Sequence, residues 1–282
     1  MNAHPVDPPV ATAPPVAAPP LEPAVQSDPT QSGPPDAPAT SAAATWSLRV
    51  ELAAAFRMAA RLGWQEAVAN HFSVALRAAG SRFLINPRWR SFAALRASDL
   101  LVLDAGAPAG ALPPDIDRTA WAIHGTMHAR LPRARCILHV HPPYATALSC
   151  LQDPTLRPID QTSARFFRRV AIDRDYGGMA DTADEGLRLT RALGDKCILL
   201  MGHHGVLVIG DTIAEAFDAL FHVERACQTL VLAYSTGQPV AVLPDEIAER
   251  TARCWEDGGA FARAHFAAIR QRLDLEEPGY AQ

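Results

Sequence analysis

Residues 136–143 read CILHVHPP, an apolar run that ends at two prolines. The apolar part has the composition of a buried β-strand, and the proline pair ends it because proline cannot donate to the ladder of a sheet. Since side chains alternate between the two faces of a strand, His139 and His141 project from the same face, with Cα atoms about 6 to 7 Å apart. This spacing suits the chelation of one metal ion. A helix is predicted to follow, over YATALSCL at residues 144–151.

A second pair of histidines lies in the sequence GHHG at residues 202–205. Strands are predicted on both sides, at residues 196–201 and 206–209, so the pair occupies a turn where glycine permits another segment to approach closely. Either His203 or His204 is a candidate third ligand. Three neutral imidazoles leave coordination positions open for water or substrate, which is typical of a catalytic metal site. The alternative is a hydrogen-bonded pair of polar side chains without a metal.

Helices and strands are also predicted before these motifs. A helix at residues 46–63 precedes two short strands at residues 83–85 and 100–103, which favour the edge of a meandering sheet. Another helix is predicted at residues 117–130, with Pro132 just beyond its end.

Two capping-box sequences start the later helices. Thr182 and Thr212 each stand three residues before a Glu, the pattern in which a hydroxyl caps the first helical turn. The second of these helices has a clear apolar stripe at helical spacing, which predicts a buried face. Its members are Ile213, Phe217, Leu220, Val223, Cys227 and Leu230.

Composition excludes several classes of protein. The chain of 282 residues has a formal net charge of −4, without the basic excess of a dedicated nucleic-acid binder. It has no run of about 18 apolar residues, so no membrane span is expected. The five cysteines are scattered and form no C-x-x-C pair, which favours reduced thiols in a cytoplasmic protein. Twelve of the 24 prolines fall in the first 40 residues. We therefore predict a disordered Pro/Ala-rich tail at residues 1–44 and a single domain at residues 45–282, which includes a C-terminal helical extension.

The sequence HVHPPYATAL at residues 139–148 resembles the metal-binding strand of the class II aldolase/adducin family, in its adducin-like branch. The resemblance covers about residues 45–280. It implies that His139, His141 and His204 ligate the metal and that His203 stands where the family usually has Asn. The other matching stretches occur in the family's order: NHFS (70–73), FLINP (83–87), ASDL (97–100), IH (123–124), DYGG (175–178) and ERAC (224–227).

This resemblance implies an α/β fold of three layers, α/β/α, around a largely antiparallel central sheet. Family members commonly form tetramers with active sites between subunits, so a homotetramer that acts on a small molecule is expected. The implied cofactor is a divalent metal ion. Zn²⁺ is expected first, and Fe²⁺ or Mn²⁺ is compatible with three imidazoles.

The chain departs from the family at two places. In the sugar-phosphate aldolases a Glu nineteen residues before the first paired histidine acts as acid/base, and this position is Ala120 here, which can transfer no proton. The Thr-Gly pair of the phosphate pocket is replaced by Arg88-Trp89-Arg90. Trp89 would fill the space of a phosphate, whereas Arg88 and Arg90 suit a carboxylate, unless both arginines face solvent.

Four more side chains are candidates for the site. Tyr144 and His124 are candidate proton donors, with packing at a helix start and a hydrogen-bonded core position as the respective alternatives. Asn70 and Ser73 match a family loop that contacts substrate, although both residue types also favour turns. We interpret the remaining histidines of interest as structural or surface residues: His128, His222 and His265.

These observations support three hypotheses. The first is a metal-dependent lyase that cleaves a C–C bond, by retro-aldol reaction or decarboxylation, in a small hydroxy- or oxo-carboxylate or a sugar-derived substrate. The second is a non-catalytic, adducin-like interaction module of the cytoskeletal kind, which the missing Glu favours. The third is a non-heme iron oxygenase, because three imidazoles also suit Fe²⁺.

Overall fold

The computed structural model describes residues 41–77, 82–107 and 112–282. Residues 1–40 of the predicted tail lie outside the described residues. Residues 42–44 belong to the first helix, α1 (Ala42–Arg61), whose first turn is capped by the Ser41 hydroxyl, which accepts from the Ala44 N–H at 3.1 Å. The helix therefore begins earlier than residue 46, the start that we predicted.

A seven-stranded sheet forms the centre of the described chain, in the order β3-β2-β1-β4-β7-β6-β5. Every neighbouring pair is antiparallel except β5 and β6, which run parallel. The largely antiparallel sheet that we expected is therefore confirmed. The strands are β1 (His71–Ala75), β2 (Arg82–Ile85), β3 (Leu101–Asp104), β4 (Cys136–Val140), β5 (Val170–Asp173), β6 (Ile198–Met201) and β7 (Gly205–Gly210).

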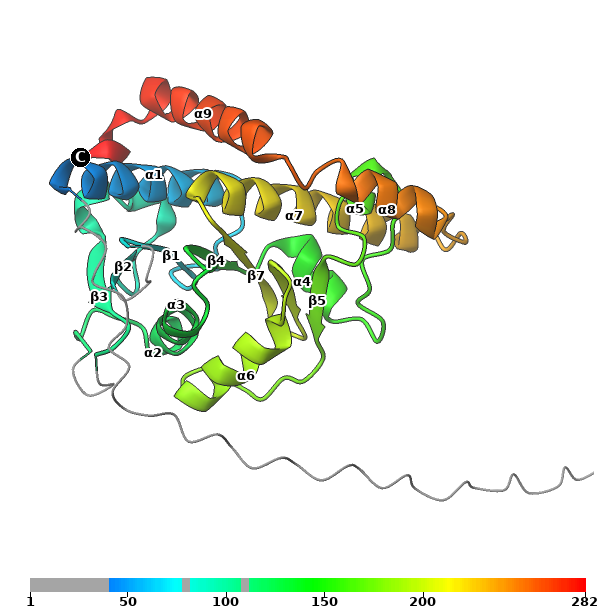
Figure 1. The fold of residues 1–282 in the computed structure, drawn as a ribbon, viewed down its shortest axis with the longest axis horizontal. Helices are drawn as coiled ribbons and strands as arrows, with labels where there is room; N and C mark the ends of the chain where they lie inside the picture. The colour runs from blue at the N-terminus through cyan, green and yellow to red at the C-terminus, as the bar shows by residue number, and fades with distance from the viewer. Residues whose placement is uncertain (1–40, 78–81, 108–111) are drawn as a thin grey trace, which may run out of the picture. The chain divides into compact units, whose positions relative to one another are not determined.

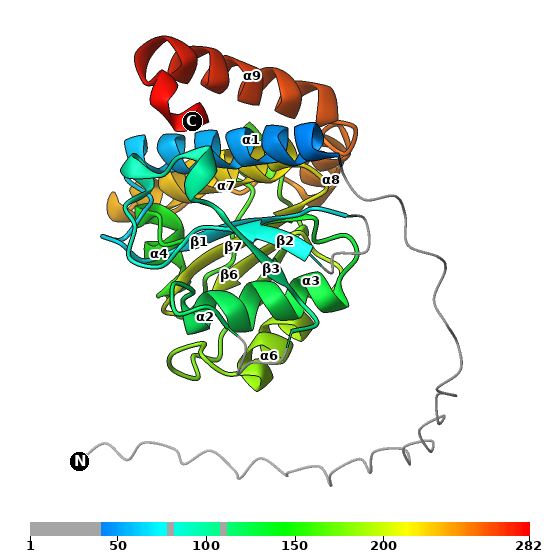
Figure 2. The same cartoon turned by 90° about the vertical axis from the view of Figure 1, so that its left-hand side faces the viewer.

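Helices cover both faces of the sheet, as Figure 1 and Figure 2 show. One layer contains α1 and α7, with α9 outside them, and the other contains α2, α3 and α6. This three-layer α/β/α arrangement confirms the predicted fold class. The remaining helices are α2 (Arg118–Ala120), α3 (Thr126–Arg130), α4 (Pro143–Ser149), α5 (Gln161–Ala164), α6 (Ala183–Leu193), α7 (Ile213–Ser235), α8 (Asp245–Arg253) and α9 (Gly259–Glu276), with short 3₁₀ helices at Phe92–Ala94, Ala97–Asp99 and Pro278–Ala281.

The two faces of β4 point into different cores. Cys136, Leu138 and Val140 pack in the larger core with residues of α1 and α7. Ile137 packs in the smaller core with residues of α3 and α6. Because residues two apart in a strand share a face, His139 faces the α3 and α6 layer together with Ile137.

Local predictions for the helices are mostly confirmed. Thr182 and Thr212 each accept the backbone N–H of the Glu three residues on, and all six residues of the predicted apolar stripe of α7 are buried. The single helix predicted at residues 117–130 is instead interrupted by a π-helical turn, Trp121–Gly125, between α2 and α3. Within the described residues, no helix is both long and apolar enough to cross a membrane.

Candidate metal centre

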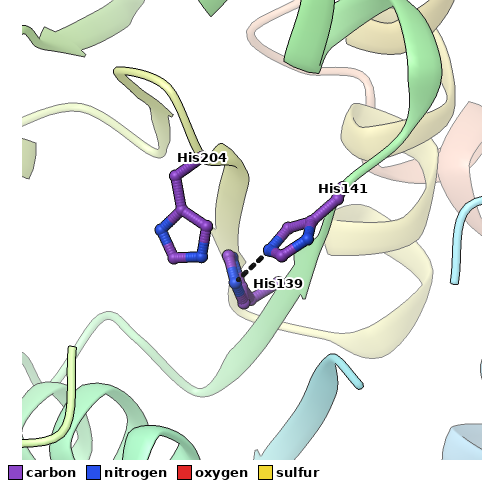
Figure 3. A group of neighbouring side chains, drawn as sticks. All are labelled: His139, His141 and His204. Carbon is purple, nitrogen blue, oxygen red and sulfur yellow. Dashed lines mark hydrogen bonds between the residues drawn. The ribbon is translucent and has the colours of Figure 1, made fainter. Parts of the chain in front are cut away.

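Three histidines converge at one end of the central strands. His139 belongs to β4, His141 follows directly after it, and His204 lies in the turn between β6 and β7. Because β7 pairs with β4, this turn is held beside the end of β4. The ring centroids lie 4.6 to 5.0 Å apart, and one ligand atom from each histidine lies within 4.8 Å of the other two (Figure 3).

Hydrogen bonds fix the orientation of two of these rings. The Nδ1 atom of His139 lies 3.1 Å from the carbonyl oxygen of Val206, and Nδ1 of His141 contacts a carboxylate oxygen of Glu66. Both partners accept hydrogen bonds, so each neutral ring carries its proton on Nδ1 and a lone pair on Nε2. The two Nε2 atoms lie 3.2 Å apart. Two facing lone pairs at this distance fit a shared cation, so the residues present suit a metal ion.

Burial lowers the pKa of His139 and of His204 and so favours their neutral forms. It lowers the pKa of His139 well below the usual value for histidine, and neighbouring imidazoles lower it further. Burial likewise lowers the pKa of His204 to about 4, with a further contribution from His141. Metal ligation requires the neutral form of histidine. The positions of the rings suit a metal ion, and the lowered pKa values of His139 and His204 favour the neutral form that ligation requires.

The turn before β7 depends on its glycines. A Cβ atom at Gly205 would lie 2.6 Å from the carbonyl oxygen of Val140 and 2.7 Å from Cδ2 of His141. A Cβ atom at Gly202 would lie 2.7 Å from the carbonyl oxygen of Asp173. His203 takes a positive φ of 56°, is exposed and lines the cavity described below, whereas the ring of His204 lies 4.6 Å from that of His141. Of the two candidates for the third ligand, His204 is therefore the one that the structure brings beside His139 and His141.

A cavity of about 600 Å³ opens at these histidines. Two buried polar atoms on its wall, Asn70 Nδ2 and Thr146 Oγ1, have no hydrogen-bond partner in the protein. Buried polar groups are normally paired, so both atoms indicate a position for a polar ligand or water. Asp117 also lines the cavity and its carboxylate accepts from the Thr119 N–H and hydroxyl. We had not predicted Asp117, which the sequence presents only as an ordinary helix cap.

The two arginines of Arg88-Trp89-Arg90 have different surroundings. Arg88 lines the cavity, and its guanidinium lies 4.0 Å from the centroid of the Trp89 ring. Trp89 also lines the cavity and is 67% exposed. Arg90 pairs with Asp99 at 3.2 Å and is not part of the cavity wall. The structure therefore places Arg88 at the cavity and Arg90 away from it.

Ser73 and His124 lie behind the cavity wall rather than on it. The Ser73 hydroxyl contacts His124 Nδ1 at 2.5 Å and His128 Nε2 at 2.7 Å, and all three side chains are buried. His124 Nε2 in turn lies 2.8 Å from Nδ1 of His71, which does line the cavity. His124 is therefore connected to the cavity through its contact with His71. His71 belongs to the NHFS motif but was not among the predicted site residues. Burial lowers the pKa of both His71, to about 3, and His124.

Tyr144 does not line the cavity. Its side chain packs against the larger core, and its backbone N–H donates to Glu224 Oε1 at 2.9 Å. The predicted role in proton donation therefore has no geometric support, and packing at the helix start is what the structure shows. The Glu224 carboxylate also accepts the Ala145 N–H at 2.7 Å, so it caps α4 from α7 and fixes the chain just after His141. The matched sequence ERAC was the available signal for Glu224.

Replacing Glu224 by glutamine is expected to flatten the pH dependence of stability between about pH 4.5 and pH 7. Burial raises the pKa of the Glu224 carboxyl to about 7, and its two backbone hydrogen bonds lower it by a smaller amount. The folded state therefore favours the protonated acid. Its contribution is complete below the unfolded pKa and is lost as pH rises to about 7, a change of roughly 2 to 3 kcal/mol in the free energy of unfolding.

Chemical denaturation of the two proteins at a series of pH values measures this effect. The exposed Glu246 at the start of α8 provides the matched control, since Glu246→Gln should retain the slope of the wild type. An unchanged slope in Glu224→Gln would show that this carboxyl is not the group responsible.

Comparisons with known proteins agree with this geometry. Residues 50–231 match the family described as Class II Aldolase and Adducin N-terminal domain. The structure is similar to that of an aldolase II superfamily protein from Pseudomonas syringae, with a TM-score of 0.77 and 30% identity, over 84% of this chain and 96% of that one. It is also similar to L-fuculose 1-phosphate aldolase from Glaciozyma antarctica PI12, with a TM-score of 0.73 and 27% identity, over 89% of this chain and 97% of that one. Gamma-adducin from Mus musculus is 31% identical over 66% of this chain, which spans 26% of the adducin. The chain therefore belongs to the class II aldolase and adducin family.

Proposed function

We propose that this protein is a divalent-metal-dependent lyase that cleaves a C–C bond in a small hydroxy- or oxo-carboxylate. The observation that carries the proposal is the convergence of three imidazoles on one cavity, with the Nε2 atoms of His139 and His141 3.2 Å apart. Cleavage of a C–C bond is supported by the family, which is named for class II aldolases, and by the similarity to an L-fuculose 1-phosphate aldolase.

His139, His141 and His204 would hold the ion, and we propose zinc, with Fe²⁺ and Mn²⁺ also compatible with the donors. When bound, the ion supplies Lewis-acid stabilisation of negative charge on a substrate oxygen. The protein's own contribution is orientation. The carbonyl of Val206 and the carboxylate of Glu66 hold two of the rings with Nε2 towards the cavity.

The cavity wall points to a carboxylate and away from the usual aldolase cycle. Arg88 presents the cationic donor that a carboxylate requires. Ala120 lines the same cavity, so the position of the family's acid/base carries no titratable group. Retro-aldol cleavage needs a base to remove a hydroxyl proton, whereas decarboxylation breaks its C–C bond by releasing CO₂ and needs no base for that step. We therefore favour decarboxylation over retro-aldol cleavage.

A direct test offers zinc-, manganese- and iron-loaded protein a panel of 2-oxo, 3-oxo and 3-hydroxy carboxylates. Release of CO₂ is measured by a coupled assay, and aldehyde products are measured by mass spectrometry. Metal-dependent turnover of at least one carboxylate is expected, together with CO₂. No turnover of any substrate by protein that retains its ion would contradict the lyase.

Removing the charge of Arg88 is expected to weaken carboxylate binding. Arg88→Met should raise KM about tenfold to a hundredfold with a smaller change in kcat, because a lost hydrogen bond to a charged group is worth about 1.5 to 3 kcal/mol. Arg90→Met is the matched control: this neighbouring arginine pairs with Asp99 away from the cavity, so its KM should stay that of the wild type. Equal KM values for wild type and Arg88→Met would place the substrate carboxylate elsewhere.

A non-catalytic, adducin-like interaction module is the second candidate. The similarity to gamma-adducin and the loss of the family Glu at Ala120 favour it. The two proposals differ in one observable: an interaction module needs neither a bound ion nor turnover. Stoichiometric metal with turnover selects the lyase, and absence of both after reconstitution with each metal selects the module.

We further propose a homotetramer in a reducing compartment, the cytoplasm. The family's tetramers, with active sites between subunits, are the basis for the assembly. All five cysteines are free thiols in the structure, which supports the compartment. Light scattering coupled to size-exclusion chromatography measures the mass of the assembly, and a monomer would overturn this part of the proposal.

A further inference from the structure

A second cluster of metal-binding residues lies in the outer helical layer, on elements other than those of the histidine triad. Asp218 and His222 are four residues apart on α7, so they share one face of that helix. His265 projects towards them from α9, which packs along α7 (Figure 1). One ligand atom of each of the three lies within 4.8 Å of the other two, the same limit that the histidine triad meets.

Both imidazoles face one carboxylate oxygen. Asp218 Oδ1 lies 2.8 Å from Nδ1 of His265 and 3.2 Å from Nδ1 of His222, and this Nδ1 of His222 also contacts the backbone carbonyl oxygen of Asp218 at 2.8 Å. The other oxygen, Oδ2, accepts from Nη2 of Arg165 at 2.7 Å. The guanidinium therefore holds the carboxylate in place by one oxygen, while the second oxygen and the two rings remain directed at each other.

Exposure is graded across this cluster. The Asp218 side chain is completely buried, whereas those of His222 and His265 retain 18% and 22% exposure. A buried carboxylate gives a strong anionic ligand, and the two partly exposed rings keep the cluster in contact with solvent. Three aromatic rings lie beside His222, with centroids 5.2 to 6.3 Å from its own: Phe221, Trp255 and Phe261.

We propose that Asp218, His222 and His265 form a second divalent-cation site, which takes zinc and links α9 to α7. One carboxylate oxygen and two imidazole nitrogens form a three-ligand set that zinc accepts, and water completes the tetrahedron. On binding, each neutral ring turns a lone pair to the ion and keeps its proton on the other nitrogen, so no proton is lost. Arg165 plays the part of the outer partner that orients a ligating carboxylate.

The expected consequence is attachment of the C-terminal helix. His265 is the single member of the set that α9 supplies, so the ion would connect this helix to the body of the domain. An ion that binds only the folded state stabilises it by RT ln(1 + c/Kd), where c is the free ion concentration, so the melting temperature rises with the logarithm of c once c exceeds Kd. Zinc should therefore stabilise the protein at this site whether or not the triad is catalytic.

The experiment counts zinc in the full-length protein after metal removal, reconstitution and desalting. Elemental analysis is expected to give about two ions per chain in the wild type and about one in His265→Gln and in His222→Gln. In each variant the remaining ion belongs to the triad. Addition of zinc should also raise the melting temperature of a His139→Ala protein, and that rise should disappear in the His139→Ala, His265→Gln double variant.

A surface thiol is the alternative ligand for a second zinc ion. Cys254 is exposed and directly precedes Trp255, whose ring lies beside His222. Cys254→Ser is therefore the matched control and should keep about two ions. Loss of the ion in Cys254→Ser, or an unchanged count in both His265→Gln and His222→Gln, would overturn the proposal. So would a zinc-edge anomalous map of wild-type crystals without a peak at Asp218. None of these results depends on turnover, so the site and the lyase can fail separately.

Discussion

His139→Ala is expected to lose the ion of the histidine triad and to lower turnover at least about a thousandfold. The ring of His139 contributes one of only three ligands, and its removal also frees His141 Nε2 from its facing partner at 3.2 Å. Two imidazoles hold zinc far less tightly than three, and the Lewis acid on which the proposed chemistry depends is lost with it. Elemental analysis is made in a His265→Gln background, which removes the second proposed zinc site, so that the metal content counts the ion of the triad alone.

The turn GHHG provides a sharper test of the same centre. His203 and His204 are adjacent, but only His204 lies with its ring 4.6 to 4.8 Å from those of His139 and His141. His204→Asn should therefore lose the ion, while His203→Asn should keep it, since asparagine also tolerates the positive φ of 56° at that position. Retention of metal and turnover in both His139→Ala and His204→Asn would disprove the triad.

Iron and zinc are distinguished by the same samples. The protein is reconstituted with each metal under anaerobic conditions and is then assayed with and without O₂. Turnover by the Fe²⁺-loaded protein alone, with consumption of O₂, would replace the lyase by an oxygenase. Turnover with zinc and without O₂ would retain the lyase. The ligand set alone does not decide, because three imidazoles suit both ions.

The features that could be predicted from the sequence are those that depend on the residue pattern within one strand or helix. Alternation along β4 placed His139 and His141 on one side, and the helical stripe after Thr212 marked the buried face of α7. Both rest on the fixed geometry of one element. The third candidate ligand was limited to two adjacent residues, and it is the folded turn that brings the ring of His204 beside those of His139 and His141.

Contacts between distant segments were not predictable in this way. Ser73 and His124 were placed in the site by their motifs, but they form a buried chain behind His71, because the π-helical turn Trp121–Gly125 contacts β1 through His124. Arg90 follows Arg88 by two residues, yet the positive φ of 60° at Trp89 separates their directions. His222 and His265 had no motif, and their proximity arises only from the packing of α9 on α7.

Gly186→Ala is expected to lower the free energy of unfolding by more than about 3 kcal/mol, although helix propensity alone would predict an increase. Alanine is favoured over glycine within a helix by about 1 kcal/mol, so an exposed position in α6 would gain stability. At Gly186, however, a Cβ atom would overlap the carbonyl oxygen of Ala122 and lie 2.7 Å from Thr126 Oγ1. The first of these is backbone, so one helix must move, which is the costly form of overpacking.

This close approach also concerns the site. The carbonyl of Ala122 belongs to the π-helical turn that follows Ala120, and the same turn contains His124, which contacts His71. Displacing the turn should therefore shift the cavity wall and lower kcat even in protein that remains folded. Thermal and urea denaturation measure the first effect, and kinetics at a permissive temperature measure the second.

Gly259→Ala is the matched control, because the atoms nearest to its Cβ are the flexible ends of Arg263 and Glu215, each 3.2 Å away. Those side chains can move at little cost, so this variant should stay within about 1 kcal/mol of the wild type. The comparison separates a general effect of removing glycine from the contact at Ala122. If Gly186→Ala proved as stable as Gly259→Ala, α6 would have room to move away from the π-helical turn, and the rigid support that we assign to the cavity wall would be wrong.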